Sequence, residues 1–263
     1  MAHAAVRDAR RISTRFSRKG ALIAETYLAF RTWDRTASIR VNIERIRQEN
    51  PIGARNSAWL REITTTLSSR FRDQEMLDPL VVLAQRGFPV DKWRACLLWH
   101  IGQQDALFYT FVCEWLYGAY RAGVVQIRTE DLVPFVVEQT RGRLRRGASL
   151  SPYSQTRTAQ DLLRMAAGFG LLKGRAVREF TGYHLPDDCF LYVLHALAEQ
   201  HSSPQRMIEA PEWRLFLMSP ADIENELLRL HQFRRVDYQA AGSLIELALP
   251  YPSLLQYAES LVA

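Results

Sequence analysis

Lysine is nearly absent from this basic sequence. Of its 34 basic residues, 31 are arginine, and only Lys19, Lys92 and Lys173 are lysine. Codon bias in a GC-rich genome accounts for this ratio, but it does not explain why the arginines gather in particular stretches. Arginine also suits contacts with phosphate, because its planar guanidinium donates two parallel hydrogen bonds. The positions of the arginines therefore carry more information than their number.

Cysteine and long apolar runs are scarce too. Cys96, Cys113 and Cys189 are widely separated and lie among apolar neighbours, as buried free thiols in a reducing compartment do, which argues against a disulfide framework or a metal cluster. No apolar run reaches the roughly 18 residues that a membrane span needs, and the basic N-terminus lacks the apolar core of a signal peptide. We therefore expect a soluble, cytoplasmic protein that does not enter a membrane.

Patterns of catalysis and metal binding are missing as well. No two of the six histidines combine metal-ligand spacing with a third candidate ligand nearby. The glycines of GFGLLKG, residues 168–174, match no phosphate-binding loop. HLPDDC, residues 184–189, has the composition of a helix start rather than of an active site. We therefore expect no enzymatic activity, no cofactor, no metal and no small-molecule substrate.

The charge is segregated along the chain. Residues 1–47 hold 11 Lys+Arg against 4 Asp+Glu, a net +7, and residues 139–178 hold 9 against 1, a net +8. Residues 48–138 hold 9 against 11, and residues 179–263 hold 5 against 12, a net −7. The formal net charge of +6 therefore hides two strongly basic stretches and an acidic C-terminal part.

The apolar periodicity is mostly helical. Helices are expected to begin near Ala21, Ile39, Ser57 as a cap, Met76, Pro89, Ala106, Thr129, Ser151 or Ser154 as a cap, and Asp187. The most apolar of these segments, residues 106–123, is expected to be the central core helix.

Two stretches break this pattern. Residues 170–186 are expected to pair as short strands between two helices, a layout that resembles a winged helix. The layout recurs at the C-terminus, where residues 233–249 predict a small β-hairpin between a helix that begins at Pro220 and a helix capped by Ser253. Two prolines mark residues 201–213 as a linker.

One arginine cluster suggests a binding site. QTRGRLRRGAS, residues 139–149, places four arginines within six positions. Like charges this close repel by on the order of 1 kcal/mol per pair in water, and an anionic partner would relieve that cost. The cluster leads into SPYSQTRT, at a helix N-terminus whose free N–H groups favour a phosphate. A solvated loop is the alternative; we predict instead that this region holds the phosphate backbone of a nucleic acid with weak sequence specificity.

The predicted binding residues fall into two groups. The first contains Arg141, Arg143, Arg145, Arg146, Ser154, Arg157, Arg164, Lys173 and Arg175. The second is a flexible arm with Arg10, Arg11, Arg15, Arg18 and Lys19. We expect three parts: a basic N-terminal arm, residues 1–19; a helical DNA-binding domain, residues 20–200; and a winged-helix-like C-terminal module, residues 214–263.

Several stretches also carry a family resemblance over roughly residues 18–200. They are GALIAETYLAFRTWD with its central Glu25, the next helix start around Asn50, Arg55 and Ser57, and LSPYSQTRTAQDLLRMAAGFGLL. These resemble the BrxA-like (DUF1819-type) proteins, components of bacterial BREX phage-defence systems. The resemblance implies a compact all-helical domain similar to bacterial antitermination factors, and the acidic, winged-helix-like end after about residue 205 departs from it in length. Together with the patterns above, we expect a mainly α fold: a compact helical bundle with winged-helix-like C-terminal elements that include a small β-hairpin. The resemblance also implies binding of double-stranded DNA without catalysis, alongside other BREX-type defence proteins.

Two alternatives stay open. An Arg-rich arm suits RNA as well as DNA, so the chain could be an RNA-binding regulator resembling an antitermination factor. It could instead be a protein scaffold in a multi-subunit defence complex, whose basic surface binds an acidic partner. Trp33 and Trp213 lie near predicted breaks, where base stacking is open to them.

Overall fold

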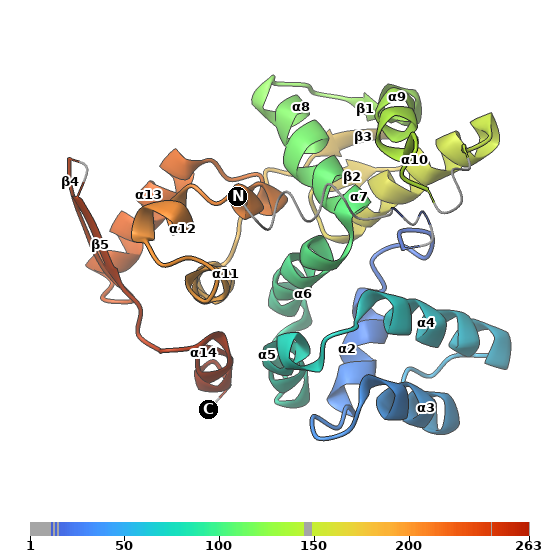
Figure 1. Ribbon diagram of the computed structural model, residues 1–263, viewed down its shortest axis with the longest axis horizontal. Helices are drawn as coiled ribbons and strands as arrows, with labels where there is room; N and C mark the ends of the chain where they lie inside the picture. Colours follow the sequence, from blue (N-terminus) through green and yellow to red (C-terminus); the bar gives the residue numbers. More distant parts are fainter. Residues whose placement is uncertain (1–11, 13, 15, 145–148, 243, 263) are drawn as a thin grey trace.

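The chain is mainly helical, as predicted (Figure 1). The computed structural model describes residues 12, 14, 16–144, 149–242 and 244–262. Helices make up 61% of the described residues, and the described strands form small antiparallel sheets.

The first five helices follow the predicted apolar groups. They are α2 (Ile23–Arg31), α3 (Ile39–Glu49), α4 (Ser57–Arg70), α5 (Gln74–Gln85) and α6 (Val90–Gln104). Side-chain caps fix where α3, α4 and α5 begin, because a cap satisfies a backbone N–H that has no partner within the helix. Asn56 Oδ1 accepts the N–H of Trp59 at 2.8 Å. The predicted cap at Ser57 is therefore wrong by one residue, since Ser57 is already the first residue of α4.

The segment from Ala106 is helical throughout but changes its winding. It consists of α7 (Ala106–Thr110), the π-helix η1 (Phe111–Leu116) and α8 (Tyr117–Arg121). Most side chains of α7 and η1 are buried, whereas α8 contributes no buried residue. The prediction of a central core helix holds for the first two parts only.

A small sheet and two helices follow one another along the chain. The elements are β1 (Ile127–Arg128), α9 (Thr129–Thr140), α10 (Pro152–Gly168), β2 (Leu172–Gly174) and β3 (Val177–Phe180). The strands lie in the order β1-β3-β2 and are antiparallel, which confirms the predicted pairing of β2 with β3. α9 and α10 pack against each other. Ser151 Oγ accepts the N–H of Ser154 at 3.3 Å, so Ser151 is the cap of α10.

The C-terminal third continues with helices and a hairpin. Its elements are α11 (Asp187–Ala198), α12 (Pro204–Ile208), the 3-10 helix η3 (Pro211–Phe216), α13 (Pro220–Gln232), β4 (Asp237–Ala241), β5 (Leu244–Ala248) and α14 (Leu254–Ser260). The predicted β-hairpin is present as β4 and β5. The predicted linker is wrong: residues 201–213 form α12 and the start of η3, and the ring of Trp213 stacks on Phe190 at 4.8 Å.

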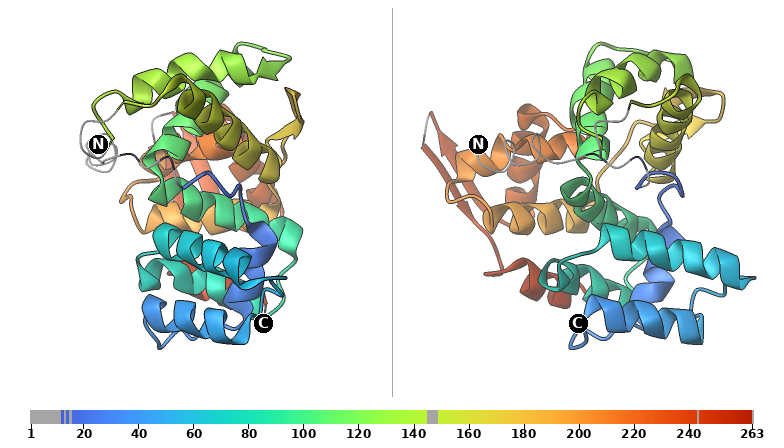
Figure 2. Two further views of the ribbon diagram at one scale, coloured as in Figure 1. Left: turned by 90° about the vertical axis from the view of Figure 1, so that its right-hand side faces the viewer. Right: turned by 45° about the vertical axis from the view of Figure 1, so that its right-hand side comes forward.

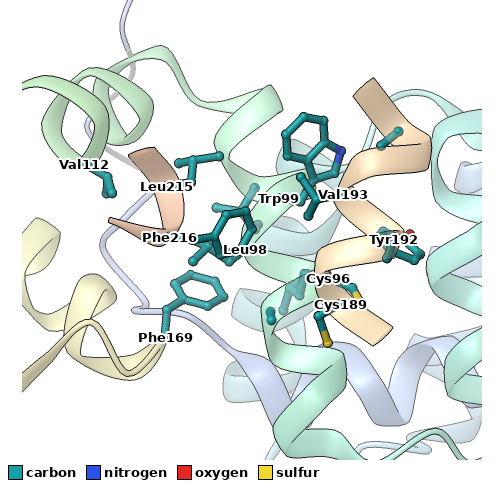
Figure 3. Packing of buried hydrophobic residues seen from close by; sticks show 14 of the residues in the cluster. Cys96, Leu98, Trp99, Val112, Phe169, Cys189, Tyr192, Val193, Leu215 and Phe216 are labelled. Carbon is teal, nitrogen blue, oxygen red and sulfur yellow. The ribbon is translucent and has the colours of Figure 1, made fainter. Parts of the chain in front are cut away.

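The core lies where α6 and α11 face η1 and η3. Figure 3 shows Trp99, Phe169 and Phe216 meeting there, with Cys96 and Cys189 buried nearby as free thiols. Trp33 and Trp213 also belong to the core, and the indole N–H of Trp213 donates to the carbonyl of Met207 at 2.8 Å. Neither tryptophan is therefore available to stack on a base.

Ion pairs tie the C-terminal elements to α6 and α11. Asp188 lies between Lys92 Nζ, at 2.9 Å, and Arg235 Nη2, at 3.0 Å, and Arg229 pairs with Asp187. The two carboxylates of HLPDDC thus bind cations brought by α6, by α13 and by the turn that follows α13. No helix among the described residues is both long and apolar enough to cross a membrane.

Candidate nucleic-acid interface

The N-terminal basic stretch meets the arginine cluster. The N–H of Ile12 donates to the carbonyl of Arg143 at 3.0 Å, and Ile12 forms a parallel bridge with Leu144. Ile12 is buried, so this pairing is part of the packed structure. Two segments about 130 residues apart, each basic, are joined at this point, in line with the expectation that they share one face.

A buried arginine holds the chain beyond this pairing. Arg70 of α4 is fully buried and donates through Nη1 to the carbonyl of Ala21 (2.9 Å) and through Nη2 to the carbonyls of Phe16 (2.9 Å) and Gly20. Burial lowers the pKa of Arg70 to about 10, so the guanidinium stays charged at neutral pH. Residues 16–21 are therefore fixed, where the sequence predicted a flexible arm up to residue 19.

This fixed segment lies beside α10 (Figures 1 and 2). A Cβ added to Gly20 would lie 3.9 Å from Cδ of Arg164, and a Cβ added to Gly168 would lie 3.0 Å from Cβ of Ala21. Glycine at 168 therefore lets the segment approach the helix more closely than a larger residue would allow. The close contact brings Arg18 to the arginines of α10.

Three of these arginines surround one carboxylate. Asp161 is buried in α10, 3.0 Å from Arg164 Nη1 and 3.6 Å from Arg157 Nε. Burial raises the pKa of Asp161, and the charges of Arg157, Arg164 and Arg18 act against that rise. One carboxylate thus pairs directly with Arg157 and Arg164, and the charge of Arg18 acts on it from nearby. The side chains of Arg157 and Arg164 remain about half exposed, at 49% and 47%, so they can still contact an anion.

The exposed face of α10 carries polar and aromatic groups. Tyr153, Thr156, Arg157, Gln160 and Arg164 are exposed and recur at three- and four-residue spacing, which places them on one side of the helix. Tyr153 is 78% exposed, the highest value among the large hydrophobic side chains described. Ser154 is half-buried beneath this face, and its Oγ accepts a hydrogen bond from Ser151 at 3.1 Å.

The turn between β2 and β3 adds further cations. Arg175 is exposed at the turn, and Lys173 pairs loosely with Glu179 at 3.4 Å. Arg178 Nη1 donates to the carbonyl of Gly174 at 3.2 Å. Burial lowers the pKa of Arg178, and the charge of Arg164 lowers it further, so the cations of the turn and of α10 share one field.

The remaining predicted residues divide into three groups. Arg141 is exposed at the end of α9, and Arg143 donates through Nη1 to Gln139 Oε1 at 2.9 Å. Lys19 turns away from α10, because it pairs with Glu62 of α4 and lies over the ring of Trp59 at 5.5 Å. Arg10, Arg11, Arg15, Arg145 and Arg146 lie outside the described residues.

Three residues of this basic surface are not part of the site predicted from the sequence. They are Arg178, Tyr153 and Gln160. The spacing from Arg157 could have found Tyr153 and Gln160, because they lie four residues before it and three after it on one helical face. Arg178 has no such signal, since its position depends on the pairing of β3 with β1.

These features define a mainly helical protein with a basic surface made by α10, the segment before α2 and the β2–β3 turn. A model of the BrxA family matches residues 10–196, more than two thirds of the chain, and the chain belongs to that family. The protein is accordingly a component of a BREX phage-defence system. The match includes the whole basic surface described here and ends within α11.

No curated protein and no solved structure matches this chain.

Proposed function

We propose that this BREX component is a non-enzymatic accessory protein that binds the phosphate backbone of double-stranded DNA with weak sequence specificity. The pairing of Ile12 with the residues of the arginine cluster carries the proposal, because it joins the two most basic stretches of the chain. Arg18, Arg157, Arg164 and Arg178 form the described centre of the surface, with Arg141, Arg143, Lys173 and Arg175 around it.

The order of the elements supports a docking geometry. A helix ending at Arg121 is followed by β1, α9, α10, β2 and β3, and the sheet order is β1-β3-β2. We infer a winged-helix unit in which α10 enters the major groove and the β2–β3 turn, with Arg175 at its tip, contacts the flanking backbone. The winged-helix layout is thereby proposed for residues 106–180, and no such role is assigned to residues 214–263.

A cavity lined in part by α5, α6 and α11 does not favour an enzyme. It has a volume of about 920 Å³ and is lined by His100, Asp105 and Glu199 among others. His100 is bound to the hydroxyl of Tyr192 at 2.8 Å, Asp105 Oδ1 accepts the N–H of Phe108 at 2.6 Å, and Glu199 accepts the N–H of Leu254 at 2.9 Å. Each of these three groups thus holds an element of the fold in place, which supports a structural role for them.

Salt dependence of duplex binding tests the proposal. If about six phosphates are contacted, log K should fall against log salt with a slope near −5. Replacement of Arg157 and Arg164 by glutamine keeps hydrogen-bond donors for Asp161 but removes two charges, so the slope should become shallower by about 2. Fluorescence anisotropy with a labelled duplex measures both slopes.

A matched control removes charge elsewhere. Arg86 and Arg206 are exposed on α5's C-terminal turn and on α12, away from α10, and R86Q/R206Q should leave the slope unchanged. Competition with structured RNA separates the alternatives. If the chain is an RNA-binding regulator, structured RNA should displace the labelled duplex at a lower concentration than unlabelled duplex does. Equal slopes for the α10 variant and the wild type would reject α10 as the binding helix.

A further inference from the structure

A second arginine surface lies on the far side of α4 from residues 16–21. α3 and α4 border a groove of about 680 Å³. Its lining residues are Ile39, Arg40, Ile43, Glu44, Arg47, Ser68, Phe71 and Arg72. Its three arginines face one carboxylate, so the groove is positively charged, and none of the three belongs to the surface around α10.

The two surfaces use opposite faces of α4. Glu62 and Arg70 of this helix contact residues 16–21, through Lys19 and the backbone carbonyls. Thr64 contacts α3, because its Oγ1 accepts a hydrogen bond from Arg47 Nε at 3.1 Å. Glu62 and Thr64 are two residues apart, which is about 200° around an α-helix. Figure 2 shows α10, the segment after residue 16, α4 and α3 following one another down the molecule.

The arginines of the groove are held in place but not neutralised. Arg47 is positioned by Thr64 and by Glu44, whose Oε2 lies 3.5 Å from Arg47 Nη1. Arg72 uses its Nε on the carbonyl of Ser69, at 3.3 Å. Among the described residues Arg40 has neither an ion pair nor a side-chain hydrogen bond, and it is exposed. Three guanidinium groups with one carboxylate leave a net charge of about +2 for a ligand.

We propose that this α3–α4 groove is a second contact for the phosphate backbone of nucleic acid, beyond the contact made by α10. The inference rests on the proposed function. Bidentate guanidinium donors and the Ser68 hydroxyl suit phosphate oxygens. A duplex presents one negative charge per about 1.7 Å of its axis, so it continues to offer phosphates past the site where α10 binds. The second contact lengthens the bound segment and adds to the salt dependence.

The test compares variants of the full chain on a labelled duplex of roughly 40 bp. R40Q/R47Q/R72Q removes the three charges, and glutamine can still bond to Thr64 and Ser69. We expect binding at fixed salt to weaken by about tenfold and the salt slope to become shallower by about 2 to 3. The hydroxyl-radical footprint on the duplex should become shorter at one end. The nucleotides that α10 protects should remain protected.

Two further variants keep the outcome interpretable. R40E reverses the charge of the arginine that has no described partner, so it should weaken binding with an unchanged melting temperature. R86Q/R206Q/R234Q removes three exposed arginines outside the winged-helix unit and the groove, and should leave slope and footprint as in the wild type.

Opposite results overturn the inference in distinct ways. If the wild type binds the duplex and the groove variants keep its slope and footprint, the groove is not a backbone contact, although the proposed function stands. If those variants instead lose binding to poly-glutamate, the groove serves an acidic protein. A wild type that leaves no footprint at all rejects both the proposed function and this inference.

Discussion

At the scale of single residues, Arg70 shows how a charge can be structural. Its guanidinium is buried and donates to three backbone carbonyls of residues 16–21, which would otherwise lie unsatisfied in the interior. An arginine is ordinarily a surface group, and the sequence around Arg70 does not indicate that its guanidinium binds backbone carbonyls in the interior. Only the structure shows this role.

Replacing Arg70 should release the N-terminal segment. R70M keeps much of the volume but leaves the carbonyls without donors, so the free energy of unfolding should drop by about 3–5 kcal/mol. R70K keeps the charge but not the forked donor, so its free energy of unfolding should lie between those of R70M and the wild type. Urea unfolding followed by circular dichroism measures the loss. A drop below about 0.5 kcal/mol for R70M would show that water replaces the guanidinium without cost.

Asp105 gives a pH-dependent prediction. Burial raises its pKa to about 6, from an ordinary value of 3.8. The native state therefore holds the proton more tightly than the unfolded state, and the contribution of this group is most favourable below about pH 4 and is lost as the pH rises through 6. At pH 8 the ionised form costs up to about 3 kcal/mol.

The variant D105N keeps the acceptor for the N–H of Phe108 and removes the charge. Its free energy of unfolding should exceed that of the wild type by about 1–3 kcal/mol at pH 8 and should equal it at pH 4. D73N is the matched control, because Asp73 caps α5 in the same way but is exposed. An equal gain of D105N at both pH values would mean that packing, not charge, is responsible.

At the scale of elements, α10 combines two separate functions on its two sides. Its buried side packs Leu162, Met165 and Ala166 into the core, and its exposed side presents Tyr153 and Arg157. A large aromatic side chain that is exposed contributes little to folding, and on the proposed binding face this ring is accessible to a partner.

Tyr153 should matter for binding but not for stability. Y153A removes a side chain that is 78% exposed, so the free energy of unfolding should change by less than about 0.5 kcal/mol. Duplex affinity should fall severalfold, since the ring lies on the proposed groove-facing side of α10. F233A is the control, because Phe233 is 66% exposed but lies far from α10 along the chain, after α13. Equal duplex affinities of Y153A and F233A would show that Tyr153 does not contact the duplex.

Helices could be predicted from the sequence much better than strands. Apolar spacing and caps are local signals, and they placed the helices from α2 to α11 close to where they lie. β1 was missed because it has two residues and pairs with β3, about 50 residues later. The linker was misjudged because Pro204 and Pro211 occupy first turns of short helices, where proline is favoured.

The candidate site was predicted only in part, for the same physical reason. Clustering of arginine in the sequence indicates the region where Arg157 and Arg164 come together around Asp161. The docking of Ile12 on Leu144 and the turn of Lys19 toward Glu62 are long-range contacts. No local pattern in the sequence encodes contacts of that kind.

At the scale of the whole molecule, ion pairs bind the acidic C-terminal part to the rest. Asp188 is central, because Lys92 of α6 and Arg235, which follows α13, both reach its carboxylate. Burial acts to raise the pKa of Asp188, but the hydrogen bonds from Lys92 and Arg235 prevail and lower it. The contribution of this group to stability is therefore present above about pH 4 and is lost as the pH falls through the lowered value.

D188N should loosen this connection. The free energy of unfolding should fall by about 1–3 kcal/mol at pH 7, because two cations lose their shared charge, and the difference between the variant and the wild type should narrow as the pH falls toward 3. D237N is the control, since the pair of Asp237 with His231 is largely exposed. Urea unfolding at both pH values tests this, and an equal loss at pH 3 would contradict an electrostatic cause.

The unequal distribution of charge makes the molecule an electric dipole. Figure 1 places the acidic elements from α11 to α14 on one side and α10, α3 and α4 on the other. Near a polyanion such a body experiences a torque as well as an attraction, so it rotates during its approach and arrives with its positive pole leading. The negative pole then points outward into solution, where other members of the defence assembly can reach it.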